Sequence, residues 1–265
     1  MFPFVAPLPT PADVFMFALV FCRIAGLFAA VPLFGGRRVS NRFKIAVVFG
    51  ITIVCLPILP IKPPPLPSDI LSMGLLILKE VAVGLTLAFI TQIIFAAVEF
   101  SGQIIGVQMG FSMAQIMDPT IGAQTQIMSV IQGLLASLFF LSLNIHHLFI
   151  SAIIDSFKVV PLGGWQMSEE LIHFLVATSS GLLVLGIRLA APVMVTLLLT
   201  SVVLGIMARS FPQMNVFMVS FPLNIGLGFM ILGSTLLFFF QVLEISFGQL
   251  KEQIDTLFRL MAKGG

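Results

Sequence analysis

The sequence predicts an all-α membrane protein, built as a bundle of about six long apolar helical segments. Apolar residues make up 58% of the 265 residues and charged residues only 9%, with a mean hydropathy of +1.14, which leaves too little polar surface to cover a soluble globule. The apolar residues gather in runs of about 20, the length that crosses the hydrocarbon core of a bilayer as a helix. Alternating ten-residue strands are absent, so helices rather than a closed barrel would pair the backbone amides.

The first segment follows a proline-rich N-terminus without the basic region of a cleaved signal peptide, so we expect it to remain in the mature protein. The second ends at Pro57 and Pro60, before a proline cluster that predicts an extended linker. The fifth contains Arg188 and Pro192 and is too long for one plain crossing, which predicts a helix that is tilted, broken or partly outside the lipid. The six segments are 12–34, 43–61, 70–98, 127–154, 171–208 and 215–243.

The basic residues give two conflicting indications of topology. The loop after the first segment holds the densest basic cluster, which predicts a cytoplasmic position for that loop; its members are Arg37, Arg38, Arg42 and Lys44. Six alternating crossings would then put the C-terminus outside, but basic residues in the tail favour the inside; they are Lys251, Arg259 and Lys263. Simple counting of crossings is therefore unreliable for this chain.

The tail from Gln249 to Lys263 has the pattern of an amphipathic helix. Its apolar face would carry Leu250, Ile254, Leu257 and Met261. Such a helix lies on a membrane surface, docks on a partner helix or packs within its own chain, and the sequence leaves these alternatives open.

Several charges lie in or beside the apolar segments, where an unpaired charge costs at least about 2.5 to 3.5 kcal/mol. They are Arg23, Lys79, Glu80, Glu99 and Arg188. One interpretation is a secondary transporter that binds an ion or solute with these charges. Pairing between helices or subunits is favoured, because no repeat of matching broken helices is visible. Arg209 and Asn215, polar residues between the last two segments, are candidates for a subunit interface.

The sequence offers no site for catalysis, a cofactor or a metal. Cys22 and Cys55 lie inside apolar runs, and the three histidines (His146, His147 and His173) lack cysteine companions and the HExxH order. No G-x-S-x-G elbow or Walker-type glycine loop occurs. The net charge of +2, without a long basic tract, argues against nucleic acid as a partner. We therefore expect a protein that is not an enzyme.

The stretch from Glu99 to Gln126 differs from an ordinary span. Glycines recur every fourth position at Gly102, Gly106 and Gly110, and methionines do so at Met109, Met113 and Met117. Such spacing is common in tightly packed membrane helices, where methionine is an ordinary filler. Interspersed glutamines and the helix-ending pair Asp118 and Pro119 instead favour a re-entrant or mobile segment that seals a pore.

Four stretches carry a family resemblance. They are Arg23 to Phe34 with its P-L-F-G continuation; S-G-Q-I-I-G-V-Q-M-G-F from Ser101, followed by Asp118-Pro119; L-S-L-N-I-H-H-L-F-I-S with Asp155 and Pro161; and R-S-F-P-Q-M-N-V-F followed by F-P-L-N-I-G-L-G. In their order and spacing they resemble the FliR family of flagellar biosynthesis proteins and its counterparts in type III secretion injectisomes.

The resemblance implies a single-copy, multi-pass subunit of the flagellar type III export gate in the bacterial inner membrane. It implies assembly with several copies each of FliP and FliQ, an FlhB-type export switch protein as neighbour, and a channel that passes unfolded secreted proteins. Residues 1–167 would form a FliP-like half and 168–265 a FliQ-like hairpin, within one integral domain raised largely out of the bilayer plane. An injectisome subunit and, less favoured, a secondary transporter remain the alternatives.

The family's pore plug would fall on residues 106–124. Gly110, Phe111, Asp118 and Pro119 match the family's residues there. The sealing role of Met109, Met113 and Met117, with Gly106 and Gly110 as hinge, is our interpretation of the residues themselves.

Overall fold

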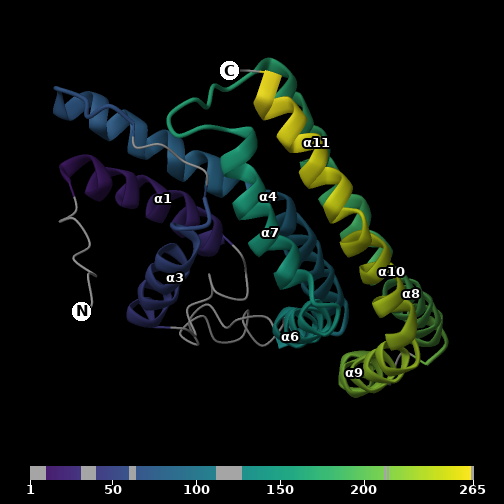
Figure 1. Ribbon diagram of the computed structural model, residues 1–265. Helices are drawn as coiled ribbons and strands as arrows, with labels where there is room; N and C mark the ends of the chain where they lie inside the picture. Colours follow the sequence, from purple (N-terminus) through teal and green to yellow (C-terminus); the bar gives the residue numbers. More distant parts are fainter. Residues whose placement is uncertain are drawn as a thin grey trace. The chain divides into compact units, whose positions relative to one another are not determined.

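The computed structural model describes residues 10–30, 40–59, 64–111, 127–211, 213 and 215–263, and among them regular structure is helical throughout, with no strand. This confirms the predicted all-α class (Figure 1). The helices, labelled as in Figure 1, are α1 (Pro11–Ala30), α3 (Asn41–Cys55), α4 (Ile70–Gln108), α6 (Ile127–Ser142), α7 (Ile145–Val159), α8 (Glu169–Ser210), α9 (Val216–Ser234), α10 (Leu236–Gly248) and α11 (Leu250–Lys263).

Local chemistry accounts for several helix ends. Thr10 and Asp13 form a reciprocal cap at the start of α1, in which each accepts a backbone N–H from the other, at 2.9 and 3.3 Å. Ser40 caps α3 by accepting the N–H of Phe43 at 3.4 Å. Asn144, with φ of 55°, separates α6 from α7, because asparagine tolerates the left-handed conformation that ends a helix.

Among the residues that the structure describes, three helices are long and apolar enough to cross a membrane: Pro11–Ala29, Ile70–Gln108 and Glu169–Ser210. Two bent pairs pass the same test when each is taken as one span, namely α6 with α7, and Met218–Ser234 with Leu236–Ala262. The described residues therefore hold three to five candidate spans, two of them bent pairs, which agrees with a membrane bundle of long apolar helical segments. The second predicted segment, 43–61, is too short because α3 ends at Cys55, before Pro57.

The fifth predicted segment is one continuous helix of 42 residues, with Pro192 inside it. A helix of this length extends about 63 Å at about 1.5 Å per residue, roughly twice the hydrocarbon thickness of about 30 Å. Of the three expected alternatives the structure therefore excludes a break and leaves a strong tilt or a part outside the lipid.

The chain divides into two compact units. The first consists of the described parts of Met1–Gln92, His146–Val176 and Leu250–Gly265, and the second of those of Ile93–Ile145 and Ala177–Gln249. Helices α4 and α8 each contribute to both units. The second unit is organised around a core of buried side chains from α4 and the residue after it, from α6 and from α8: Ile105, Met109, Met128, Ala190, Val193 and Leu197.

Helix α11 has the amphipathic character that the sequence predicts. Its buried side chains include Leu250, Ile254, Leu257 and Met261, whereas its charged residues Lys251, Glu252, Asp255 and Arg259 are exposed. Of the alternatives open at the sequence level, packing within the chain is the one observed.

Candidate functional site

The C-terminal end of α4 packs against α6 with almost no side-chain volume between them. A Cβ on Gly102 would lie 2.5 Å from the Cα of Ser129, closer than real contacts allow. Two hydrogen bonds flank this approach: Ser101 Oγ donates to Gln132 Oε1 at 2.7 Å, and Ser129 Oγ donates to the Glu99 carbonyl at 3.0 Å. Gly102 therefore permits a direct backbone contact between the helices.

The other two glycines of the predicted ladder have different surroundings. A Cβ on Gly106 would meet Met128 at 3.7 Å, an ordinary van der Waals contact. Gly110 adopts φ of +91° just after α4 ends, a conformation that favours glycine, and a Cβ there would come within 2.9 Å of the Phe221 ring. Of the three, Gly102 permits helix packing and Gly110 permits the turn that ends α4.

Met109 anchors this end of α4 in the core of the second unit. Its side chain is fully buried, and its Cε would lie 2.7 Å from a Cβ on Gly228 of α9. Phe111, partly buried, packs against the same core. The structure thus brings Gly106, Met109, Gly110 and Phe111 together at one place. The remaining predicted seal residues lie outside the described residues: Met113, Met117, Asp118 and Pro119.

A second constellation lies in the first unit, around a buried ion pair. Arg23 Nε on α1 donates to Glu80 Oε2 on α4 at 2.6 Å, and the two side chains are 1% and 0% exposed. Arg23 Nη1 donates to the carbonyls of Ser156 and Val160, at 3.1 and 3.0 Å. Because α7 ends at Val159, the guanidinium lies at the negative end of that helix, where a cation is stabilised.

Glu80 and its neighbour extend this network to the turn after α7. The second carboxylate oxygen of Glu80 accepts the N–H of Gly163 at 2.7 Å, and Lys79 Nζ donates to the Gly163 carbonyl at 3.3 Å. Gly163 has φ of +73°. The guanidinium of Arg23 also lies 4.2 Å from the centre of the Phe157 ring, within cation–π range. We call Arg23, Glu80 and their partners on α7 and at Gly163 the Arg23–Glu80 clamp.

A glycine-mediated crossing of α1 and α4 sits beside the clamp. A Cβ on Gly26 would lie 2.7 Å from the Val81 carbonyl oxygen, and one on Gly84 would clash with the Arg23 carbonyl oxygen and lie 2.8 Å from the Leu27 nitrogen. The two backbones therefore touch within one turn of the ion pair, which keeps the short Arg23–Glu80 contact in place.

The other polar residues singled out from the sequence do not contact the clamp. The side chains of Glu99, Arg188, Arg209 and Asn215 are exposed in this chain. Asn215 caps α9, since its side chain accepts the N–H of Met218 at 3.4 Å. Sequence reasoning singled out Arg23, Lys79 and Glu80 but missed Gly26, Gly84 and Gly163. The sequence held a signal for two of them: Gly26 follows Arg23 by three positions and Gly84 follows Glu80 by four, so each lies one helical turn from a buried charge.

In the part of the chain that the structure describes, no three His, Cys, Asp or Glu side chains are grouped to hold a metal ion. The rings of His146 and His147 lie 4.3 Å apart, and His173 faces Glu169 on the exposed start of α8 at 3.8 Å. The contacts of the two constellations hold helices in place. The clamp ties together α1, α4 and α7, and the end of α4 is held by α6 and α9.

Comparison with known proteins gives a consistent picture. The sequence profile of the family described as "Bacterial export proteins, family 1" matches residues 14–250. Three similar curated proteins, each named "Flagellar biosynthetic protein FliR", come from Bacillus subtilis, Pectobacterium carotovorum and Escherichia coli. The first is 36% identical over 248 residues, covering 92% of this chain and 95% of the relative. The second is 34% identical over 213 residues, covering 80% and 81%, and the third 34% over 208 residues, covering 78% of each.

Proposed function

The chain belongs to family 1 of the bacterial export proteins, and from this membership we propose that it is a subunit of the flagellar type III export gate. Its long apolar helices are those of a membrane protein, and we place it in the bacterial inner membrane, at the flagellar basal body, as a multi-pass subunit. The relatives are named as flagellar biosynthetic proteins, which favours the flagellar system over an injectisome. The proposed role requires no catalysis.

We propose that this subunit forms part of a protein-conducting channel and that residues 106–124 close it at rest. The observation that supports this proposal is that the first residues of the segment are packed firmly against the core of the second unit. Met109 is fully buried against α9, and α4 turns out of its helical path at Gly110. A plug needs such a fixed base, because a segment anchored only by flexible chain would not return to one position after each substrate.

The residue types of the segment suit a seal for many different chains. Unfolded substrates vary at every position, so a closure must be apolar and deformable without selecting a sequence. Methionine side chains repack at little cost, which is the role we assign to Met113 and Met117. Burying each such side chain, or that of Phe111, is worth about 1.5 to 3 kcal/mol, and a threaded substrate replaces those contacts with its own.

The assembly partners follow from the same proposal. We propose FliP and FliQ, several copies each, and an FlhB-type protein as neighbours, with residues 1–167 acting as a FliP-like half and 168–265 as a FliQ-like hairpin. Helices α8 and α9 support the second assignment: they are joined by the short stretch 211–215 and share one core through Val193, Leu197 and Ile231. Arg209 and Asn215, at that connection, are proposed as subunit contacts.

The clamp argues against the transporter alternative. Glu80 is fully buried, with one oxygen occupied by Arg23 and the other by the Gly163 amide, so it lacks a free ligand for a passing ion. Arg188, the other charge that a transporter would use, is exposed on α8. We therefore assign the clamp to the internal stability of the first unit.

The test has two arms. Purification of the tagged chain in mild detergent should recover the companion subunits, whereas a transporter should bind a defined small solute as an isolated chain. In the second arm, deletion of residues 110–122 should leave a complex of normal composition that leaks ions at rest. Shortening the linker at residues 64–67 is the matched control and should not leak. An unchanged resting conductance of the 110–122 deletion would reject the plug, and recovery of the chain without companions would reject the gate.

A further inference from the structure

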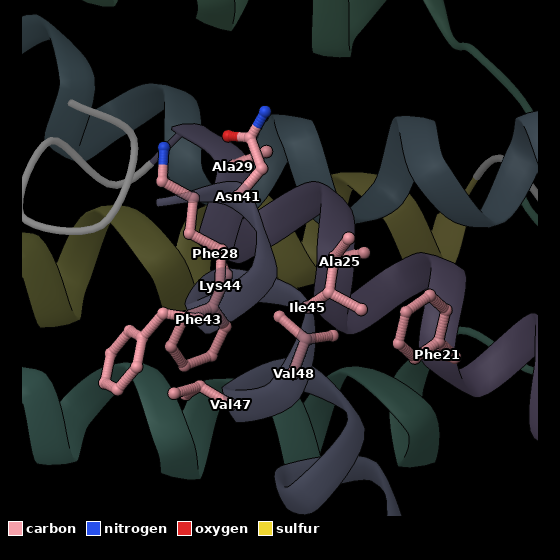
Figure 2. A pocket seen from close by; sticks show the side chains of 10 residues that line it. All are labelled: Phe21, Ala25, Phe28, Ala29, Asn41, Phe43, Lys44, Ile45, Val47 and Val48. Atoms are coloured by element: carbon pink, nitrogen blue, oxygen red, sulfur yellow. The ribbon is translucent and has the colours of Figure 1, made fainter. Parts of the chain in front are cut away.

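A groove between α1 and α3 in the first unit includes no residue of the Arg23–Glu80 clamp or of the proposed plug. Its volume is about 300 Å³. It is lined by Phe21, Ala25, Phe28 and Ala29 from α1 and by Asn41, Phe43, Lys44, Ile45, Val47 and Val48 from α3 (Figure 2).

The apolar lining of the groove favours a hydrocarbon chain as its occupant. Eight of the ten lining residues are apolar, and a polar occupant lying against them would lose its hydrogen bonds to water without replacement. The volume is at the lower limit of the roughly 300 to 1,000 Å³ of small-molecule sites. A helix with its side chains is about 10 to 12 Å across, so a groove of only about 300 Å³ suits one extended chain better than a packed helix.

One end of the groove is polar and basic. Figure 2 shows the amide of Asn41 and the ammonium of Lys44 at the same end, away from the rings of Phe21 and Phe43. The first turn of α3 contains no acidic residue, and Arg42 on that turn is exposed. The side-chain NH2 of Asn41 and the ammonium of Lys44 can both donate hydrogen bonds, so this end complements an anion.

An anion joined to a hydrocarbon chain is the chemistry of an acidic phospholipid. We propose that this groove binds one acyl chain of an anionic phospholipid and that Asn41 and Lys44 hold its phosphate. Basic pockets on the cytoplasmic side of membrane proteins bind such headgroups, and the basic cluster from Arg37 to Lys44 predicts that side for this loop. Phe43 and Ile45 of the groove wall are themselves exposed, and Phe49, further along α3 and outside the groove, is an exposed apolar side chain as well.

Lipid binding to the full-length chain in neutral detergent tests the proposal. Phosphatidylglycerol should bind more tightly than phosphatidylcholine with the same acyl chains. Lys44→Gln should lower the affinity for phosphatidylglycerol about fivefold, the effect of one basic residue at a membrane surface, and leave phosphatidylcholine unchanged. Lys251→Gln on α11, an exposed lysine, is the matched control. Equal binding of the two lipids by the wild type would overturn the proposal, as would equal losses with the two lysine variants.

A second measurement places the chain in the groove and does not require a destabilising substitution. Phe43→Trp adds a fluorophore to the groove wall, and the single natural tryptophan, Trp165, is buried and serves as background. Phosphatidylglycerol with brominated acyl chains should quench the new signal by more than half and leave the wild-type signal unchanged. Absence of quenching would reject an acyl-chain site. So would loss of the quenching when inorganic phosphate alone is added, because phosphate would then compete for the whole site.

Occupation by a protein partner is the remaining outcome. Ala29→Phe should fill part of the groove and, when combined with Phe43→Trp, abolish quenching of the introduced tryptophan, with unchanged thermal stability in lipid-free detergent as the check on folding. If Ala29→Phe instead releases a co-purifying protein and leaves lipid binding intact, the groove is a protein contact and the lipid proposal is wrong.

Discussion

The carbonyl oxygen of Arg23 lies directly against Gly84, at a position that leaves no space for a Cβ. One turn of helix away, the side chain of Arg23 forms its 2.6 Å ion pair with Glu80. The same residue therefore joins α1 to α4 twice, through its backbone and through its side chain. Because the helix backbones touch, the two charges meet over a short distance, away from solvent.

Substitution of Gly84 by alanine should destabilise the first unit. The added methyl group must push α1 away from α4, and overpacking of this kind costs about 1 to 3 kcal/mol, or more where backbone is in the way. Gly74→Ala is the matched control on the same helix, since a Cβ there meets nothing within 4 Å. Thermal unfolding in detergent should show a clear loss for Gly84→Ala and no loss for Gly74→Ala. Equal melting temperatures for the two variants would contradict a close contact between α1 and α4 at Gly84.

Removing one charge of the clamp should be worse than removing both. Arg23→Met or Glu80→Met alone leaves an uncompensated buried charge, which costs about 3 to 5 kcal/mol. The double variant should therefore lose less than either single variant, and so less than the sum of the two single losses, measured as free energies of unfolding in a double-mutant cycle. The double variant should still be weaker than wild type, because Arg23 also holds carbonyls of Ser156 and Val160.

An exposed ion pair provides the control for this cycle. Lys158 and Asp155 lie 2.8 Å apart, and their side chains are about half exposed. Lys158→Ala should change stability by less than about 1 kcal/mol. Strict additivity of the two Met substitutions would show that Arg23 and Glu80 do not stabilise one another.

Met109→Ala should loosen the base of the proposed plug. The side chain is fully buried, and truncation of a buried methionine costs about 2 to 5 kcal/mol through lost burial and the remaining cavity. Met230→Ala is the control, because that side chain on α9 is 67% exposed. In the assembled complex, Met109→Ala should also raise the resting ion conductance. A variant as stable and as tightly closed as Met230→Ala would show that Met109 is not the anchor.

Two substitutions at Asn215 separate capping of α9 from subunit contact. Asn215→Ala removes the acceptor for the Met218 N–H and should cost about 0.5 to 2 kcal/mol, with lower recovery of the complex. Asn215→Ser preserves a capping side chain and should restore stability. If recovery of the complex returns together with stability, Asn215 acts as a cap. Recovery that stays low with serine supports the proposed interface.

The sequence was sufficient for the class of fold and for the elements with strong local signals. Composition alone excludes a soluble globule, and the absence of strand patterns leaves helices as the way to pair the backbone. The spacing from Leu250 to Met261 indicated the amphipathic α11, and Pro57 indicated that the second helix ends near it, although α3 ends at Cys55, six residues before the predicted bound. Each of these features depends on neighbouring residues, so local periodicity contains the information.

The contacts of individual charges required the tertiary structure. Arg23 pairs with Glu80, which is 57 residues away in the sequence, and with carbonyls at the end of α7 that are more than 130 residues away. No local sequence pattern specifies which helices face each other. The same is true of Gly26 with Gly84 and of Met109 with Gly228. The sequence by itself determined that this chain is helical, apolar and similar to export proteins. Only the packed structure decided which glycines allow helices to touch and which charges are paired, because burial and pairing depend on distant helices meeting at close range.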